Sequence, residues 1–426
     1  MGRRWLAIGS ALAAIGLVMW LLPKAPPSRA AGSGPARGTA THRHEWFTAS
    51  EDSSSRQAET STGLRDGKAR VLVSNRQATV SVINPVSGRV LYRAHNGVAS
   101  PTTNRIYGDA GNAFEITSTQ TGQSVGRVQA LKGMELHVAS TGGGRLAFAR
   151  AEKHGASKWL PLGRSHTKIT VVKTNAATSK RTYDLKGNYG IEAFSTDDRQ
   201  LFLIKYMPAR NPWHYGVRRL DLASGMVHEI ARSKQNAPGE MNGTGRLSRF
   251  STDGTELYTL YTQQGPNYTH VHPDDAENQQ SYAFIHQLNL ERAWTHCIDL
   301  PAPFGTGMAT SHAMAVSGDG RLYVADPSSG GLAVVDTDRS LVLQSATAAL
   351  RFLRKAANAT VSSDGTLYLA GRHKIKAFDG MSLRHQGTVT THRRVSWIAA
   401  RDSKLYVGTQ KKILVFNPRT GRRLNG

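Results

Sequence analysis

Ser317-Gly-Asp-Gly-Arg-Leu-Tyr323 is a short segment that the chain repeats, and it returns almost unchanged as Ser362-Ser-Asp-Gly-Thr-Leu-Tyr368. Stretched forms begin at Ser140, Ser195, Ser251 and Ala400. An Asp-Gly pair favours a tight turn, because Gly tolerates positive φ and Asp bonds its own backbone. Short strands that recur at roughly 40 to 50 residues are typical of a radial array of sheets. The chain is therefore predicted to be an all-β protein of the β-propeller class.

Each repeat contains enough strands for one blade. An apolar stretch precedes the Ser, the Leu-Tyr run follows the turn, and a third run such as Leu332–Asp336 ends in a polar turn. A fourth, more polar strand fits the outer edge of a sheet. The second strands are counted at Val71, Ile106, Leu146, Leu201, Leu257, Leu322, Leu367 and Leu405. We expect four-stranded antiparallel blades over residues 66–426, seven or eight in number, with eight favoured.

Two stretches resemble a known repeat. Val71-Leu-Val-Ser-Asn75 followed by Val80–Gly88 resembles the YVTN-type repeat of lactonase-like and amine-dehydrogenase-like propellers, and His312–Gly320 resembles the other half of that repeat. The resemblance covers about residues 70 to 424. It implies the propeller fold. It assigns no activity, because its motifs consist of strand and turn residues.

Residues 1–30 have the pattern of a targeting segment. An Arg pair precedes the uncharged, mainly apolar run Trp5–Leu22, which is expected to be helical. The small residues Ser28 and Ala30 fit the cleavage site of a signal peptide. The run is also long enough to span a bilayer as an uncleaved signal-anchor. The anchor is slightly favoured, and both interpretations stay open.

Residues 31–65 are rich in Pro, Ala, Gly, Ser and Thr, which predicts a flexible tether. Its one expected ordered piece is a strand at His44–Ala49, which is a candidate for closing the ring because the first repeat has no inner strand of its own. An anchor, a tether and a propeller together predict an extracytoplasmic protein, anchored to the membrane or secreted. Basic residues after the apolar run favour the opposite orientation, and this alternative stays open.

The chain carries 54 Lys and Arg against 30 Asp and Glu, a formal net charge of +24. Such a charge attracts polyanions, so the expected partner is a cell-envelope polymer, an anionic lipid surface or a partner protein. Nucleic acid is disfavoured, because export would separate it from the protein and the sequence contains no readout module. The alternative is an Arg-rich, solvated surface without a function of its own.

Positions near the start of the inner strands are candidate ligand-binding residues at the mouth of the central channel. They stand five and three residues before the repeat Ser, and they share a face because side chains in a strand alternate with period two. These positions give Glu135, His137, Glu192, Arg246 and His312. The alternative is a set of solvated channel residues bridged by water.

Three consecutive repeats have long segments between their second and third strands, namely Arg150–Lys168, Tyr206–Arg218 and Tyr261–Ala283. Loops of this length are usually functional or disordered. Aromatic faces beside cationic groups suit sugar rings or anions. The predicted binding wall consists of Trp159, Arg164, Arg210, Trp213, His214, Tyr215 and Tyr268.

The third of these segments also contains a candidate site for a divalent metal. It consists of His270, His272 and Asp274. Two His residues at i and i+2 on an extended segment point the same way, and a carboxylate can complete the ligand shell. Polar loop ends explain these residues equally well. The sequence identifies no other cofactor.

Three classes of function fit these features. The favoured class is a non-catalytic, monomeric binding platform for an anionic envelope ligand or a partner protein. The alternative is a lactonase-like or other metal-assisted hydrolase at the channel mouth, with His312 or Glu192 as the base. The His-Glu-x-x-His motif that would support metal-assisted hydrolysis does not occur. A redox role is the third class, and the single Cys297 excludes a haem attachment pair.

Overall fold

In the computed structural model, eight β-sheets follow one another along the chain. The structure describes residues 71–74, 80–84, 90–94, 97–150, 161–175, 179–232, 241, 244–262, 283–305, 309–353, 358–401, 403–409, 412–418 and 420–424. They belong to one compact unit, His42–Gly426. The predicted targeting segment, the tether and the strand at His44–Ala49 lie outside the described residues. Within those ranges, no helix is both long enough and apolar enough to cross a bilayer.

Each sheet is one blade, and the first four blades contain the following strands. Blade 1 consists of β1 (Val71–Ser74), β2 (Val80–Ile83) and β3 (Val90–Ala94). Blade 2 consists of β4 (Val98–Ala99), β5 (Arg105–Asp109), β6 (Ala113–Ser118) and β7 (Ser124–Gln129). Blade 3 consists of β8 (Glu135–Ala139), β9 (Arg145–Ala149), β10 (His166–Lys173) and β11 (Lys180–Lys186). Blade 4 consists of β12 (Asn188–Phe194), β13 (Gln200–Met207), β14 (His214–Asp221) and β15 (Val227–Glu229).

The remaining strands form blades 5 to 8. Blade 5 consists of β17 (Thr244–Phe250), β18 (Glu256–Thr262), β19 (Phe284–Asn289) and β20 (Trp294–Asp299), and β16 (Ala231–Arg232) pairs in parallel with β20. After the 3-10 helix η1 (Ala309–Ser311), blade 6 consists of β21 (Ala313–Val316), β22 (Arg321–Ala325), β23 (Gly331–Asp336) and β24 (Leu341–Thr347). The 3-10 helix η2 (Arg351–Leu353) precedes blade 7, with β25 (Asn358–Val361), β26 (Thr366–Ala370), β27 (Lys374–Asp379) and β28 (His385–Thr390). Blade 8 consists of β29 (Val395–Arg401), β30 (Lys404–Thr409) and β31 (Ile413–Phe416).

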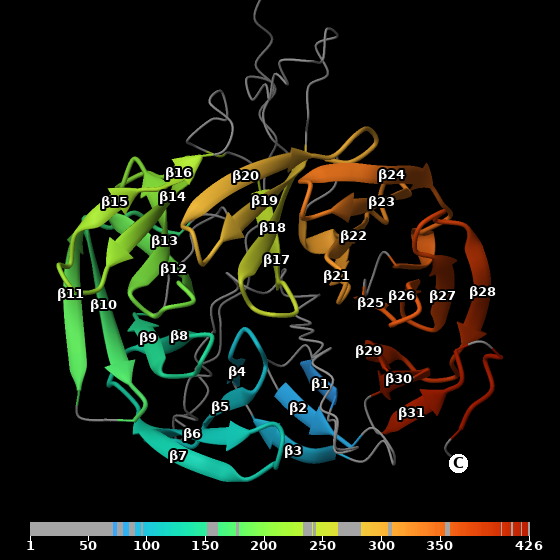
Figure 1. Ribbon diagram of the computed structural model, residues 1–426, viewed down its shortest axis with the longest axis horizontal. Helices are drawn as coiled ribbons and strands as arrows, with labels where there is room; N and C mark the ends of the chain where they lie inside the picture. Colours follow the sequence, from blue (N-terminus) through green and yellow to red (C-terminus); the bar gives the residue numbers. More distant parts are fainter. Residues whose placement is uncertain are drawn as a thin grey trace, which may run out of the picture. The chain divides into compact units, whose positions relative to one another are not determined.

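The blades are arranged as a ring around a common hub (Figure 1). β25 packs against both β21 and β29, and β29 packs against β1, so the last blade lies beside the first. The propeller prediction is confirmed, and the sheets of the described residues give its favoured count of eight. Blade 8 ends in an isolated bridge between Phe416 and Arg423.

The Ser-x-Asp-Gly turn is held by its own side chains. In blade 7 the Ser362 hydroxyl donates a hydrogen bond to Oδ1 of Asp364 at 2.5 Å, and Gly365 adopts a φ of +81°. The Ser362 amide donates to the carbonyl oxygen of Thr366 at 3.0 Å and starts the ladder between the first two strands. The same Ser–Asp hydrogen bond measures 2.6 Å in two other blades, from Ser251 to Asp253 and from Ser195 to Asp197. The repeated segment therefore forms the turn between the first and second strands of a blade and stabilises it with its own side chains.

A Tyr in the second strand joins one blade to the next. Tyr107 of β5 is fully buried, and its hydroxyl donates to the carbonyl oxygen of Gly143 in the turn of blade 3 at 3.0 Å. Burial raises the pKa of Tyr107 to about 12, because the phenolate would lose its solvation. A Cβ added at Gly143 would lie 2.5 Å from the Tyr107 hydroxyl, so the close approach of the two blades requires glycine there. The repeat thus encodes both the blade and its neighbour contact.

Candidate functional site

The two faces of the ring carry different connections, because successive turns of an antiparallel meander lie at opposite ends of its strands. One face carries the turns that join the first strand of a blade to the second and the third strand to the fourth, such as Ser317–Gly320. We call it the turn face. We call loop face the opposite face. It carries the segments between second and third strands and those that lead into the next blade, such as Gly371–His373 and Thr391–Arg394.

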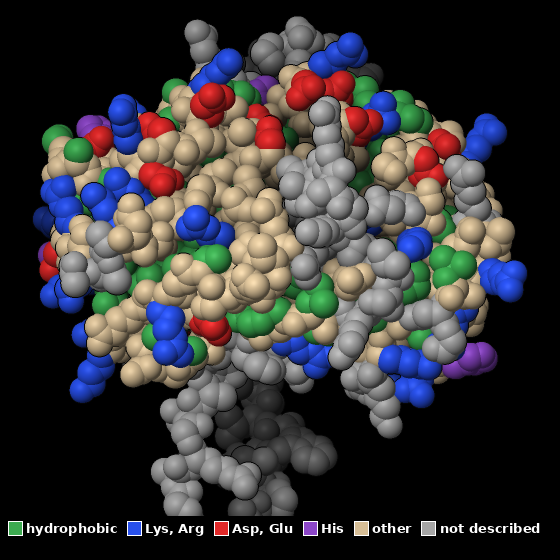
Figure 2. Space-filling model, turned by 60° about the horizontal axis from the view of Figure 1, so that its bottom comes forward, with side chains coloured by type: hydrophobic (Ala, Val, Ile, Leu, Met, Phe, Trp, Pro, Cys, Tyr) green, Lys and Arg blue, Asp and Glu red, His purple; other side chains and the backbone are tan. Residues whose placement is uncertain are grey.

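Acidic side chains of the turn face are engaged within their own turns. Oδ1 of Asp379 accepts a hydrogen bond from the Ser382 amide at 2.7 Å, and Oδ1 of Asp221 accepts one from the Ser224 amide at 2.6 Å. These backbone hydrogen bonds lower the pKa of both carboxyl groups. Figure 2 shows that charge is distributed unevenly, since acidic side chains gather toward the upper edge of that view whereas Lys and Arg occur all around.

A cluster of basic residues lies on the loop face of blades 7 and 8. Arg372 and His373 form the turn between β26 and β27, and His392, Arg393 and Arg394 lie in the connection from β28 to β29. Arg394 is partly buried, and the other four are exposed. We call these five residues the basic patch.

Backbone hydrogen bonds lock the two loops of the basic patch together. The Val395 amide donates to the carbonyl oxygen of Arg372 at 2.8 Å, and the Thr391 amide donates to that of His373 at 2.8 Å. The Thr391 hydroxyl donates to the carbonyl oxygen of Arg393, also at 2.8 Å. The basic side chains therefore project from a fixed backbone, so binding an anion there does not require ordering of the loops.

Within the described residues, the loop face of blades 7 and 8 carries no carboxylate. From residue 351 to the end, the sequence holds sixteen Lys and Arg, three Asp and no Glu. Asp364 and Asp379 belong to turns of the turn face, and Asp402 lies outside the described residues. The positive potential of the basic patch is therefore not cancelled by described carboxylates of these blades on the same face.

His312, a predicted mouth residue, is buried against an aspartate. It is 1% exposed, and its Nε2 atom lies 3.5 Å from Oδ2 of Asp326 in the turn between β22 and β23. Asp326 also accepts hydrogen bonds from the Ser328 amide at 2.8 Å and the Ser329 hydroxyl at 2.7 Å. Burial alone raises the pKa of Asp326, but the hydrogen bonds from His312 and the two Ser residues outweigh it and hold the pKa well below its usual value. The pair fixes a turn of the loop face.

The other predicted mouth residues lie on the inner strands of three blades. Glu135 and His137 lie on β8 and Glu192 on β12; Glu135 is partly buried, whereas His137 is 2% and Glu192 5% exposed. The strand register shifts at His137 and again at Glu192. Such a bulge inserts an extra residue, so the period-two alternation that grouped these side chains is interrupted there. The side chain of Arg246, in β17, lies outside the described part, and the convergence of all five stays a prediction.

Hydrogen bonds join two of the predicted loops of the binding wall. The Arg164 amide donates to the carbonyl oxygen of Ala209 at 2.9 Å, and Nε of Arg164 donates to Oδ1 of Asn188 at 2.8 Å. Asn188 is fully buried and donates to the carbonyl oxygen of Leu162 at 3.2 Å. Arg164 of blade 3 therefore lies beside the blade 4 loop that carries the exposed Arg210.

The second predicted loop is shorter than the sequence suggests. β13 extends to Met207 and β14 begins at His214, so only residues 208–213 remain between them. The ladder pairs Tyr206 with Tyr215, and Tyr215 is 3% exposed with its ring centroid 5.5 Å from that of Tyr261. Continued strand pairing thus places Tyr215 in the interior between blades 4 and 5.

Trp213 is the exposed aromatic residue of this loop, with 61% of its surface accessible and its ring centroid 3.9 Å from that of His214. The other wall and metal candidates lie outside the described residues, namely Trp159, Tyr268, His270, His272 and Asp274. In the described ranges, no group of three or more His, Cys, Asp or Glu is placed to hold a metal ion. The binding wall and the metal site therefore stay predictions.

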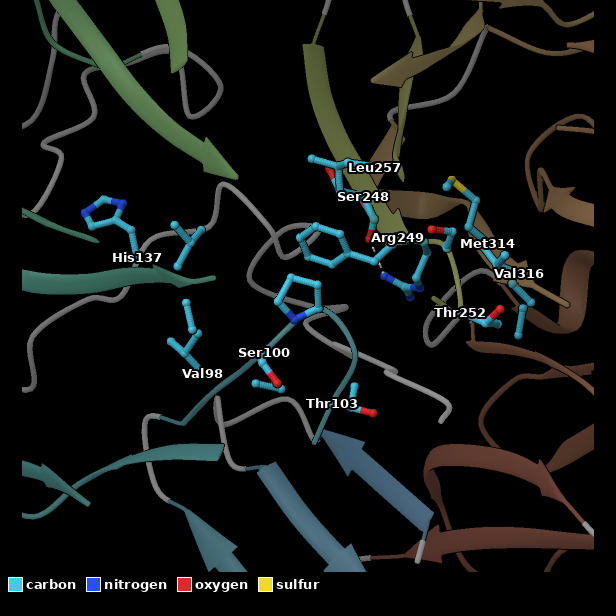
Figure 3. Close-up of a pocket in the computed structure, with 18 residues that line it drawn as sticks. Val98, Ser100, Thr103, His137, Ser248, Arg249, Thr252, Leu257, Met314 and Val316 are labelled. Carbon is cyan, nitrogen blue, oxygen red and sulfur yellow. Dashed lines mark hydrogen bonds between the residues drawn. The ribbon is translucent and has the colours of Figure 1, made fainter. Parts of the chain in front are cut away.

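A cavity of about 110 Å³ lies at the hub. Its walls come from the inner strands β4, β8, β17, β21 and β25 and from nearby turns. Figure 3 shows Val98, Ser100 and His137 on one side and Arg249, Met314 and Val316 on the other. Arg249 donates a hydrogen bond to the carbonyl oxygen of Ser248 at 2.9 Å.

This cavity was not predicted, because the sequence pattern places the candidate site at the beginning of the inner strands. The lining includes the turn residues Ser251 and Thr252, so the cavity lies toward the other end, and of the predicted mouth residues only His137 lines it. The small residues Ala139, Ala315 and Ala359 on three inner strands are the signal that points to it.

No protein-family model matches the chain, and no curated protein sequence matches it. Among solved structures, BamB from Moraxella catarrhalis is 11% identical, with 85% of this chain and 97% of that chain covered and a TM-score of 0.42. Sqt1 from Saccharomyces cerevisiae is 13% identical, with coverage of 77% and 84% and a TM-score of 0.46. AztD from Citrobacter koseri is 13% identical, with coverage of 78% and 97% and a TM-score of 0.38. We draw no functional argument from likeness at this level, and the resemblance to the YVTN-type repeat is not confirmed by a family model.

Proposed function

We propose that this protein is an extracytoplasmic, membrane-tethered β-propeller that acts as a non-catalytic binding platform for an anionic ligand of the cell envelope. The observation that carries the proposal is the basic patch on the loop face of blades 7 and 8. The extracytoplasmic location is supported by the N-terminal apolar run Trp5–Leu22 and the tether-like composition after it.

The basic patch has the properties that anion binding needs. Its guanidinium groups match phosphate and carboxylate oxygens in geometry as well as in charge, because each presents a planar fork of N–H donors. The hydrogen bonds of Thr391 and Val395 hold the two loops in place before any ligand arrives. The described carboxylates of blades 7 and 8 lie on the turn face, so an extended anion can contact several cations of the loop face at once.

The proposal is tested by binding of the full-length protein to a soluble poly(glycerol phosphate) polymer, compared with uncharged dextran. At about 50 mM salt we expect binding to the anionic polymer and none to dextran. Affinity for the polymer should fall at least about tenfold when the salt is raised to about 500 mM, because exposed charges are then screened over a few ångströms. Failure to bind the polymer at low salt would contradict the proposal.

A further inference from the structure

Two exposed apolar side chains lie in neighbouring connections of the loop face. Among the described residues, the large apolar side chains that are exposed in such connections are those of Leu162, at 50%, and Trp213, at 61%. Leu162 precedes β10 in blade 3, and Trp213 precedes β14 in blade 4. Single exposed apolar residues are normal on a protein surface, whereas apolar side chains that gather at one place mark an interaction site.

Backbone packing holds these two connections together. Nδ2 of Asn188 donates to the carbonyl oxygen of Leu162 at 3.2 Å and to that of Ala209 at 3.4 Å, so one buried amide joins both connections. There is no room for a Cβ at Gly163, because the carbonyl oxygen of Arg210 occupies that space. The exposed side chains of the two connections therefore project from one packed unit, which we call the loop tip.

The loop that carries Trp213 is fixed from within. The Trp213 amide donates to the carbonyl oxygen of Met207 at 2.9 Å, and the Asn211 amide donates to that of Pro208 at 3.2 Å. The centroid of the Trp213 ring lies 3.9 Å from that of His214. A ring that is already held in place loses little conformational entropy when it binds a partner.

The loop tip is cationic as well as apolar. Its connections, residues 161–165 and 208–213, contain two Arg and no Asp or Glu, and Arg210 is exposed. A Trp side chain suits the interface between lipid headgroups and acyl chains, because its ring is apolar and its N–H group needs a polar partner. A guanidinium matches the lipid phosphate in geometry and charge. A soluble polyanion would leave Leu162 and Trp213 in water, whereas the surface of an anionic bilayer takes up all three side chains.

We propose that the loop tip docks on an anionic lipid bilayer, with Trp213 and Leu162 in the interfacial region and Arg210 at the lipid phosphates. The proposal rests on the membrane tether of the proposed function, which would keep the propeller within reach of the bilayer. It does not rest on the basic patch, which lies on blades 7 and 8.

The test uses the full-length protein and vesicles of phosphatidylglycerol and phosphatidylcholine, with bromine on some of the acyl chains. Bromine quenches Trp fluorescence at short range, so the difference between the wild type and Trp213→Phe reports on Trp213 alone. We expect its emission to move to shorter wavelength and to fall at least about twofold, because the ring enters the interface. Unchanged emission of Trp213 would overturn the proposal.

A Trp on the opposite face provides the matched control. Met381 is 47% exposed and lies between β27 and β28 on the turn face, so Met381→Trp in the Trp213→Phe background places a comparable ring away from the loop tip. We expect no quenching of this Trp. Equal quenching at the two positions would show that the propeller contacts the vesicle without a preferred face, which would also overturn the proposal.

A charge reversal tests the ionic part of the contact. Arg210→Glu should reduce the quenching of Trp213 at least about twofold, because each basic residue near an anionic surface adds about 1 kcal/mol. Arg292→Glu makes the same change of charge at an exposed position of the turn face and should leave the quenching unchanged. Equal quenching in wild type and Arg210→Glu would overturn the placement of Arg210 at the phosphates. The vesicles contain no poly(glycerol phosphate), so these outcomes are separate from polymer binding by the basic patch.

Discussion

Replacing Arg372, Arg393 and Arg394 by Glu is expected to weaken binding of poly(glycerol phosphate) at least about 100-fold at low salt. Each Lys or Arg near an anionic surface contributes about 1 kcal/mol, and three such contributions correspond to about 100-fold in the dissociation constant. Arg372 and Arg393 have exposed side chains, and their carbonyl oxygens accept the hydrogen bonds that join the two loops. Because a change of side chain keeps these backbone hydrogen bonds, the folded structure should persist. The measurement is a binding isotherm at about 50 mM salt.

The matched control reverses three Arg residues on the turn face. Arg199, Arg292 and Arg339 are exposed, and their replacement by Glu changes the net charge by the same amount. We expect this variant to keep the wild-type affinity within about threefold, because its substitutions lie more than a Debye length from the loop face. Equal losses in both variants would show that total charge, and not the basic patch, binds the polymer.

Asp326→Ala is expected to cause the largest loss of stability, about 3 kcal/mol or more. The substitution removes the carboxylate that faces His312 and accepts hydrogen bonds from Ser328 and Ser329, and it leaves the buried His312 without that partner. The shift of the denaturant midpoint measures the effect. The control is Asp336→Ala in the next turn of the same blade, where a partly exposed carboxylate accepts the Arg339 amide at 2.9 Å; we expect a loss of about 1 kcal/mol there.

The stabilisation by Asp326 should also depend on pH. Its pKa in the folded protein lies below the usual value of about 3.9, so the carboxylate stabilises the fold above about pH 4 and loses this effect as pH falls through its lowered folded pKa. The stability difference between the wild type and Asp326→Asn should therefore shrink below about pH 4. A difference that grows on acidification would contradict a stabilising carboxylate.

The fold could be predicted because its signals are local. The Ser362 hydroxyl donates to Asp364, and Gly365 adopts a left-handed backbone conformation, all within one turn. Because a turn of this kind requires the same residue types in every blade, it can be recognised in the sequence. The blade count followed from the predicted second strands, and the structure has one sheet at each of these positions. The position at Val71 differs from the prediction of a second strand, because among the described residues Val71–Ser74 is β1, the first strand of its sheet, and packs against β29.

The candidate sites were harder to predict because they depend on contacts between blades. Period-two alternation does not anticipate the bulges at His137 and Glu192, and one such shift redirects the side chains that follow. Tyr215 was expected in a loop, because no local sequence signal shows that β14 continues to pair with β13 at Tyr206. The basic patch joins residues about twenty positions apart through backbone hydrogen bonds, which composition does not reveal.

The most direct measurement of the central claim is amide hydrogen exchange of the full-length protein with and without poly(glycerol phosphate). We predict that the polymer slows exchange in residues 371–375 and 391–396, on the loop face of blades 7 and 8, and leaves the turns of the turn face unchanged. Protection confined to the turn face, or spread evenly over the ring, would contradict a binding platform built on the basic patch.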